Sequence, residues 1–238
     1  MPTILAIETS AERASAALLL GDQLFTQEAD GGKTHSAAIL PLVQRLLGQA
    51  GIRLEQCEAL AFGSGPGSFT GVRTAAGVVQ GLAFGSRRPV IPVVTLLAMA
   101  QACRSRSGAA DVLAILDARM GEVYWAQYRY EDRDGDDSGG WREVVAPTLS
   151  APAAVAPRGT AVACGNGLQA YADAFAGAAF AAGALPDVMP HALQIAQLAR
   201  LAFARGETLA AQDAQPLYLR NKVALTTSER LAKAGAAA

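Results

Sequence analysis

Residues 63–73 read Gly63-Ser64-Gly65-Pro66-Gly67-Ser68-Phe69-Thr70-Gly71-Val72-Arg73, which places four glycines and a proline between an apolar segment and a helical one. Glycine reaches backbone angles that other residues avoid and proline fixes φ, so this stretch predicts a rigid corner. A P-loop needs a lysine and a hydroxyl after its glycines, whereas Gly71 precedes Val72 and Arg73. The corner is therefore interpreted as a packing and partner-contact element, and the helix N-terminus remains its one anion-binding feature.

Composition narrows the class of protein further. The chain has 238 residues, 51% of them apolar, and a formal net charge of −1. It lacks a stripe of Lys and Arg interleaved with aromatic residues, so strong independent binding of nucleic acid is not expected. No apolar run is long enough to cross a bilayer and the start lacks a basic signal-peptide region, which predicts a cytoplasmic protein without a membrane partner.

The residues that bind metals or form disulfides are few and scattered. Cys57, Cys103 and Cys164 form no C-x-x-C pair, and the best interpretation of all three is as small buried residues. The two histidines, His35 and His191, lack the spacing by which one helix presents two ligands to a metal. We therefore expect no metal site and no metallohydrolase chemistry.

Hydrophobic periodicity and turn residues predict the elements of the first half. The strands expected there are residues 3–7, 14–20, 23–28, 59–62 and 89–94. The helices expected there are residues 34–49 with Thr34 as N-cap, 71–84, and 96–103 with Thr95 as N-cap.

The second half begins in the same way as the first. Residues 104–108 are predicted to be a linker, and the strands that follow it are 112–116, 122–128, 144–145 and 161–164. Alanine-rich helices are predicted at 168–179 and 192–205. Two halves that each open strand-turn-strand indicate an internal duplication. We therefore expect an α/β protein with a first lobe at 1–103 and a second at 109–238, the C-terminal segment packing back on the first lobe.

Two first-lobe helices carry an unusual outer face. Helix 34–49 is expected to place on the sheet the stripe Ile39, Leu40, Val43, Leu46, Leu47 and Ala50. Helix 71–84 is expected to bury Val72, Ala75, Ala76, Val79 and Ala83. Its two outward glycines each cost about 1 kcal/mol against alanine, which close approach of another helix would offset. The predicted partner interface is Pro41, Leu42, Arg45, Arg73, Gly77, Gly81 and Phe84; the alternative is that this face meets the second domain of the same chain.

Five segments in order resemble the TsaB family, formerly called YeaZ, which is the bacterial accessory subunit for making threonylcarbamoyladenosine in tRNA. The segments are Ile4–Ser10, Thr34–Ser36 with Leu40–Leu42, Gly65–Arg73, Asp117–Arg119 with Glu122–Tyr124, and Pro216–Arg220. The resemblance runs along nearly the whole chain. It implies the two-lobed actin, sugar kinase and Hsp70 (ASKHA) fold, with duplicated βββαβα-type lobes that flank a nucleotide cleft.

The resemblance also implies a role without catalysis. The catalytic TsaD relatives carry a metal-binding H-x-x-x-H, and its two positions correspond here to Thr95 and Met99, which do not replace imidazole in such a site. In the family the first-lobe helices bind TsaD. The resemblance thus implies a TsaD-type catalytic partner, a TsaE-type ATPase in a larger complex and indirect contact with tRNA. Separately, the exposed apolar pair of first-lobe helices is suited to pair with its own copy, so a homodimer is an expected form of the chain when it is alone.

The same resemblance indicates where a nucleotide would lie. The phosphate-facing turns of the fold correspond to Thr9 and Ser10 in one lobe and to Gly165, Asn166 and Gly167 in the other. Glu8 stands where many members of the wider fold have an aspartate that organises a metal-nucleotide. We expect no cofactor of the chain's own, and weak ATP or ADP binding, at an interface shared with a partner, remains an alternative.

The leading hypothesis is a non-catalytic subunit that supports TsaD in transferring a threonylcarbamoyl group to tRNA adenosine. One rival is an actin-like or sugar-kinase-like ATPase or phosphotransferase, which requires a carboxylate in the cleft such as Glu8. A second rival is a glycoprotease-like peptidase, although neither histidine has an evident nucleophile or orienting acid beside it in the sequence.

Overall fold

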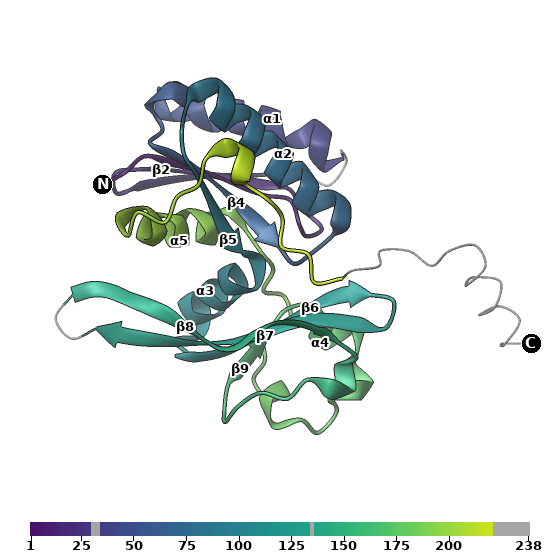
Figure 1. Ribbon diagram of the computed structural model, residues 1–238. Helices are drawn as coiled ribbons and strands as arrows, with labels where there is room; N and C mark the ends of the chain where they lie inside the picture. The colour runs from purple at the N-terminus through teal and green to yellow at the C-terminus, as the bar shows by residue number, and fades with distance from the viewer. Residues whose placement is uncertain (30–33, 134–135, 221–238) are drawn as a thin grey trace, which may run out of the picture.

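The computed structural model describes residues 1–29, 34–133 and 136–220, which form two lobes around two β-sheets (Figure 1). The five-stranded sheet of the first lobe has the order β3-β2-β1-β4-β5. Its strands are β1 (Ile4–Glu8), β2 (Ser15–Leu20), β3 (Gln23–Glu28), β4 (Ala59–Gly65) and β5 (Val90–Val94). The central strand β1 pairs antiparallel with β2 and parallel with β4.

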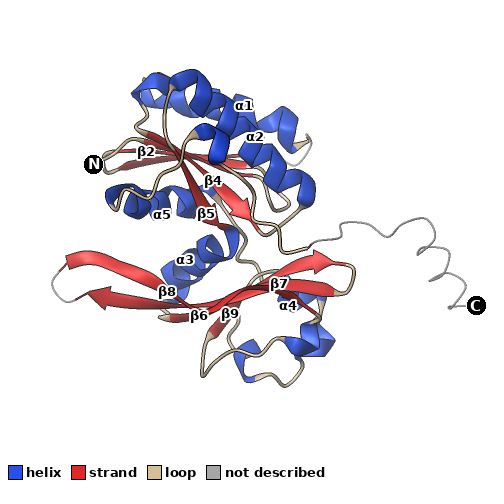
Figure 2. Cartoon of the chain, viewed as in Figure 1, coloured by secondary structure: helices blue, strands red, loops and turns tan. Residues whose placement is uncertain are grey.

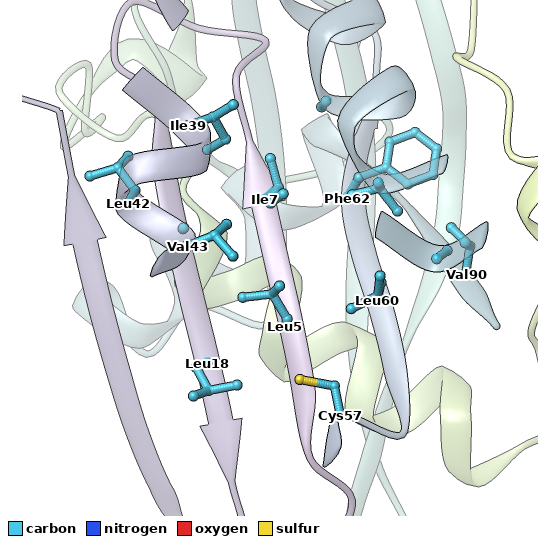
Figure 3. Close-up of a cluster of buried hydrophobic side chains, with 14 of the residues drawn as sticks. Leu5, Ile7, Leu18, Ile39, Leu42, Val43, Cys57, Leu60, Phe62 and Val90 are labelled. Atoms are coloured by element: carbon cyan, nitrogen blue, oxygen red, sulfur yellow. The ribbon is translucent and has the colours of Figure 1, made fainter. Parts of the chain in front are cut away.

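Helices cover both faces of this sheet (Figure 2). One face packs against α1 (His35–Ala50) and α2 (Phe69–Ser86), in the core whose main side chains Figure 3 shows. The opposite face packs against α3 (Thr95–Ser107) and α5 (Ala192–Ala204). Alternate residues of β1 serve the two cores, because Leu5 and Ile7 face α1 and α2 while Ile4 and Ala6 face α5.

The second sheet repeats the order of the first in a shorter form. Its order is β8-β7-β6-β9, with strands β6 (Asp111–Arg119), β7 (Glu122–Arg133), β8 (Asp136–Ser150) and β9 (Val162–Cys164). Strand β6 pairs antiparallel with β7 and parallel with β9, as β1 does with β2 and β4. The match in order agrees with the predicted duplication. In the second lobe, however, the helices are reduced to α4 (Gly167–Ala170) and 3₁₀ turns at Pro152–Ala154, Ala172–Phe175 and Ala179–Ala181.

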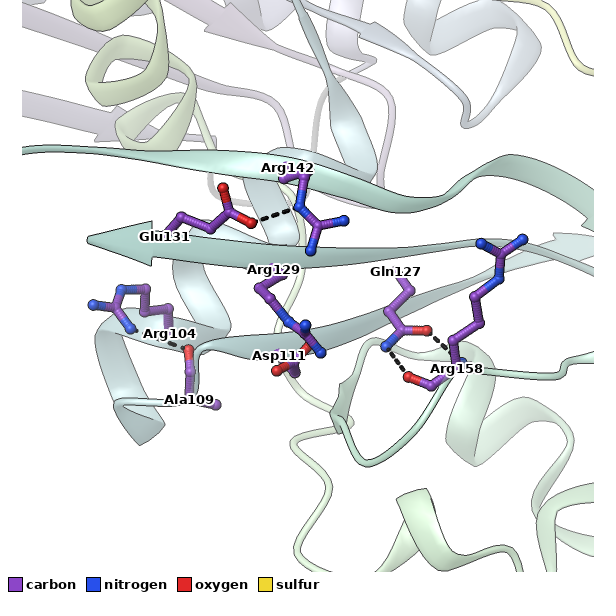
Figure 4. Close-up of polar contacts among 8 residues, drawn as sticks. All are labelled: Arg104, Ala109, Asp111, Gln127, Arg129, Glu131, Arg142 and Arg158. Carbon is purple, nitrogen blue, oxygen red and sulfur yellow. Dashed lines mark hydrogen bonds and ion pairs between the residues drawn. The ribbon is translucent and has the colours of Figure 1, made fainter. Parts of the chain in front are cut away.

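Polar contacts tie the second sheet to its surroundings (Figure 4). The Arg129 Nε donates to the Asp111 Oδ1 at 2.7 Å across β6 and β7. Gln127 is completely buried, and its side-chain amide both donates to the carbonyl of Arg158 and accepts from the Arg158 N–H. A buried side-chain amide costs free energy unless its donor and its acceptor are both paired, and here the backbone of Arg158 pairs both. The two hydrogen bonds therefore fix the loop before β9 to the second sheet.

The end of the described chain returns to the first lobe. Helix α5 lies on the first sheet, Leu209 forms an antiparallel bridge with Val90, and the segment then passes a 3₁₀ turn at Ala211–Asp213. The Leu217 N–H donates to the Ser64 carbonyl at 2.7 Å. No helix of the described residues is long and apolar enough to cross a membrane.

Most predicted boundaries of the first half are confirmed within a few residues, but three local predictions are wrong. Residues 104–107 continue α3 instead of forming a linker, and the helix ends where Gly108 takes a left-handed φ of 72°. Thr95 begins α3 without capping it, since its hydroxyl accepts from the Gly65 N–H at 3.0 Å. The helix predicted at 168–179 is one short helix followed by 3₁₀ turns, and Gly177 has a left-handed φ of 79°.

Candidate functional site

The glycines of the corner at 63–71 make room for the turn between β1 and β2. A Cβ on Gly71 would overlap the Thr9 carbonyl oxygen, and one on Gly67 would stand 2.6 Å from the Ser10 Cβ. The Thr9 hydroxyl donates to the Gly71 carbonyl at 2.6 Å, and the Ser68 N–H donates to the Ser10 carbonyl at 2.8 Å. The predicted packing role of this corner is confirmed within the chain.

Glu8 lies behind this turn and does not reach the cleft. Its side chain is completely buried, one carboxyl oxygen accepts from the Ser10 N–H, and Oε2 has no hydrogen-bond partner among the described residues. A Cβ on Gly63 would overlap Oε2. Burial raises the pKa of the Glu8 carboxyl, against the opposing effect of the hydrogen bonds from Ser10. The carboxyl is therefore held in the protein interior, away from any cleft ligand.

A cavity of about 420 Å³ lies between the lobes. Two of the five residues expected to contact phosphate, Ser10 and Asn166, line it. Asn166 is already engaged, because its Oδ1 accepts from the Asp117 N–H at 2.9 Å. The other three residues pack within the chain. The Thr9 hydroxyl donates to the Gly71 carbonyl. The Ile115 carbonyl oxygen would overlap a Cβ on Gly165 and would lie 3.1 Å from a Cβ on Gly167.

The carboxyl at the position expected to organise a magnesium-nucleotide does not reach the cavity. Glu8 is buried behind Ser10, and the described acidic residues that line the cavity are Glu12 and Asp117. The backbone carbonyl of Leu217 also lies 2.9 Å from where a Cβ on Gly65 would stand, so part of the glycine corner is covered by the chain itself.

The outer face of α2 is arranged as predicted. Gly77 and Gly81 are exposed, and no described atom lies within 4 Å of a Cβ built on either. Phe84 follows one turn later with 81% of its surface exposed. Arg73, also exposed, stacks its guanidinium 3.6 Å from the Phe69 ring centroid. The alternative, that this face meets the second domain of the same chain, holds only at its edges: Arg73 bonds the Tyr218 hydroxyl and Gln80 bonds the Ala214 carbonyl, but the described chain makes no such contact at Gly77 or Gly81.

The face predicted for α1 is wrong at two positions. Leu42 is 1% exposed and belongs to the core, whereas Leu40, which was expected on the sheet, is 45% exposed. Pro41 is half-buried and Arg45 is exposed, with its Nε 3.4 Å from the Gln27 Oε1. Leu42 takes the place of Leu40 in the buried stripe, whereas Ile39, Val43 and Leu46 lie on the predicted side. The outer face of α1 therefore presents Leu40, Pro41 and Arg45.

The positions that correspond to the H-x-x-x-H of the TsaD relatives are part of the core. Thr95 and Met99 are completely buried, and a Cβ on Gly165 would overlap the Met99 Cε. No group of three or more His, Cys, Asp or Glu side chains that could hold a metal ion occurs among the described residues.

Both histidines have structural partners in place of catalytic ones. The His35 ring nitrogens lie 3.0 and 3.1 Å from the carbonyls of Thr9 and Glu12, which fixes the β1–β2 turn on α1. His191 is the N-cap of α5, where its Nδ1 accepts from the Leu193 N–H at 3.1 Å. Burial lowers the pKa of His191. Neither ring is hydrogen-bonded to a hydroxyl or thiol in the described chain, which argues against a peptidase centre.

Sequence reasoning missed one cluster at the mouth of the cleft. There the Arg73 Nε donates to the Tyr218 hydroxyl at 2.8 Å, and the Arg220 Nη2 donates to the Glu122 Oε2 at 2.5 Å. The segment 216–220 was noted for its resemblance alone. Its two long polar side chains two residues apart give no local sign of their partners, which are more than 90 residues away.

The two sheets of matching strand order, with a cavity between them, define a two-lobed protein of the ASKHA class. Comparison with known proteins agrees. The family profile of TsaD, described as tRNA N6-adenosine threonylcarbamoyltransferase, matches residues 25–226. A solved structure described as YeaZ from Pseudomonas aeruginosa superposes with a TM-score of 0.81 at 38% identity, covering 92% of this chain and 100% of that one.

Relatives of known function show which family within this class the chain belongs to. The tRNA threonylcarbamoyladenosine biosynthesis protein TsaB of Escherichia coli is 40% identical over 226 residues, covering 93% of this chain and 96% of its own. TsaB of Haemophilus influenzae is 39% identical over 230 residues, covering 93% and 94%. The chain belongs to the TsaB (YeaZ) family of tRNA threonylcarbamoyladenosine biosynthesis proteins.

Proposed function

We propose that this chain is a non-catalytic subunit that binds a TsaD-type catalytic subunit through the outer face of α1 and α2, and so permits threonylcarbamoyl transfer to tRNA adenosine. The observation that carries the proposal is the exposed face of α2. Glycine in a helix interior costs about 1 kcal/mol against alanine, and nothing in the described chain approaches Gly77 or Gly81. A large exposed aromatic, Phe84, continues the same face. A surface with these properties is suited to the close approach of a second protein.

The absence of catalysis is the second part of the proposal. It is supported by the buried state of Glu8, Thr95 and Met99, which removes the carboxylate and the two ligand positions from the cleft. The proposal assigns no metal and no nucleotide of its own to the chain. A TsaE-type ATPase completes the larger complex, tRNA is contacted through the partners, and the assembly works in the cytoplasm.

The same face also suggests what the isolated chain does. An exposed apolar patch can pair with its own copy around a two-fold axis, so we propose a homodimer that the TsaD-type subunit displaces. The two complexes then compete for Gly77, Gly81 and Phe84.

The test is a comparison of two glycine-to-arginine variants mixed with the purified TsaD-type subunit. Gly77→Arg places a long charged side chain on the α2 face without an intrachain overlap, and it should abolish both the complex in analytical ultracentrifugation and the stimulation of tRNA modification. The control is Gly140→Arg on β8, where a Cβ likewise meets no described atom within 4 Å. Gly140→Arg should behave as the natural chain. A Gly77→Arg variant that still forms the complex would refute the proposed interface.

A further inference from the structure

Residues 214–220, which we call the strap, run from the first lobe to the second along the edge of the interlobe cavity (Figure 1). The strap begins on α2 and β4. Ala214 is completely buried in the first core and its carbonyl accepts from the Gln80 Nε2 at 2.7 Å. Three residues later the Leu217 N–H donates to the Ser64 carbonyl. The beginning of the strap is therefore fixed to the first lobe.

The middle of the strap is held by the first turns of α2. The Tyr218 hydroxyl accepts from the Arg73 Nε at 2.8 Å, and the Arg73 guanidinium lies 5.4 Å from the Tyr218 ring centroid. Phe69 completes the cluster, with its ring centroid 6.1 Å from that of Tyr218. Stacking of a guanidinium on two aromatic rings adds to the hydrogen bond, so Tyr218 has a defined position on the first lobe.

The end of the strap is bound by the second lobe. Leu219 packs against the core between α3 and the second sheet. The Arg220 side chain is only 14% exposed, and its Nη2 contacts the Glu122 Oε2 at 2.5 Å and the Arg119 carbonyl at 3.4 Å. These partners lie at the β6–β7 turn, where Arg119, Met120 and Gly121 all have left-handed φ angles. An ion pair whose arginine is mostly buried and also contacts a carbonyl is screened less by solvent than a fully exposed pair, although the Glu122 side chain is 38% exposed.

We propose that the strap sets the closure of the two lobes. Tyr218 and Arg220 are two residues apart in the chain, yet each is held by a different lobe. Any opening of the cleft must therefore break the Arg220–Glu122 pair or detach Tyr218 from Arg73. The chain's own C-terminal segment thus makes the bridge between the lobes that a cleft ligand would otherwise make.

A consequence is that the cleft and the α2 face are coupled. Arg73 lies on the same helix as Gly77 and Phe84 and holds Tyr218, so a protein bound on that helix acts on the strap through one side chain. This inference goes beyond the proposed function, because closure by the strap is a property of the isolated chain and does not depend on which partner binds.

The test measures the distance between the lobes in the full-length chain. Spin labels are attached to cysteines that replace Gln44 on α1 and Gln169 on α4, both exposed, while the buried native cysteines stay unlabelled. Electron paramagnetic resonance then gives the distance distribution. Arg220→Gln and Tyr218→Ala should each shift it to longer distances and remove its narrow main peak. Glu122→Gln, which cuts the same pair from the other side, should do the same.

The control is Arg205→Gln. It removes an arginine whose Nε lies 2.6 Å from the Glu207 Oε1, a pair formed within one turn and not between the lobes. Arg205→Gln should leave the distance distribution unchanged. If Arg220→Gln, Glu122→Gln and Tyr218→Ala all keep the natural distribution, the strap does not set lobe closure and the inference is overturned.

Discussion

Replacing Gly77 by alanine should make the monomeric chain more stable when it is measured at concentrations too low for the proposed homodimer to form. Gly77 lies inside the 18-residue helix α2, has no left-handed φ, and offers open space where the new Cβ would stand. Alanine is favoured over glycine in a helix interior by about 1 kcal/mol, because glycine loses more backbone entropy on folding. For a domain of this size the gain corresponds to roughly 2–4 °C in Tm.

The matched control lies on the same helix. A Cβ on Gly71 would overlap the backbone carbonyl oxygen of Thr9, so Gly71→Ala should destabilise the chain by about 1–3 kcal/mol, as overpacking generally does. Urea denaturation of both variants, with thermal melts alongside, measures the two effects. If Gly77→Ala were neutral or destabilising in the monomer, the α2 face would not be open in the single chain, and the interpretation of Gly77 and Gly81 as partner-contact residues would be wrong.

Four other substitutions test the core and the buried ionisable groups. Leu42→Ala should lower the free energy of unfolding by about 2–5 kcal/mol, because Leu42 is in the core. Leu40→Ala should change the free energy of unfolding by only roughly 0.5 kcal/mol, but it should weaken the complex with a TsaD-type subunit. Equal losses of stability in the two variants would contradict the observed face of α1. Burial lowers the pKa of His191 below its ordinary 6.5, so the imidazole takes up a proton more readily in the unfolded chain than in the folded one. The stability of the fold should therefore decrease as the pH falls below about 6.5. His191→Asn, which keeps an N-cap, should lose that part of the pH dependence in urea melts at pH 5–8. Burial raises the pKa of Glu8 above 4.5, so the contribution of this carboxyl to stability should decline as the pH rises above 4.5. Glu8→Gln should remove this decline and make the chain more stable at pH 7. A variant that is less stable at pH 7 would show that the fold needs the carboxylate.

Local pattern was sufficient where one face of an element is uniformly apolar. The core side of α2 could be predicted residue by residue, because small and β-branched residues recur there at helical spacing and the outer side, apart from Phe84, is polar or glycine. Helix α1 was harder. Leu40 and Leu42 lie on either side of Pro41, so the spacing alone allows either leucine to face the sheet, and only packing in the first core selects Leu42.

Composition and spacing both misled in residues 168–179. The segment is rich in alanine and places Leu168, Tyr171 and Phe175 at i, i+3 and i+7, which favours helix, but the backbone leaves the helical region at Tyr171, where φ is −130°, and again at Gly177, where φ is 79°. The prediction of the candidate site was incomplete for a different reason. Ser10 and Asn166 do meet at one cavity, as the resemblance implied, yet the segment that crosses it could not be foreseen, since Arg220 and Glu122 become neighbours only when both lobes are assembled.

The position of α5 has a consequence for how this protein is made. Its apolar side covers the strand residues Ile4, Ala6, Ala61 and Ile91, although it follows the whole second sheet in sequence. A ribosome that has synthesised residues 1–107 has thus produced all five strands of the first sheet but not the helix that shields one of its sides. The apolar surface that α5 covers stays exposed on this intermediate until nearly a hundred more residues have been synthesised. The first lobe therefore cannot complete its folding before the second lobe is made, and a fragment that ends at α3 should aggregate when it is expressed alone.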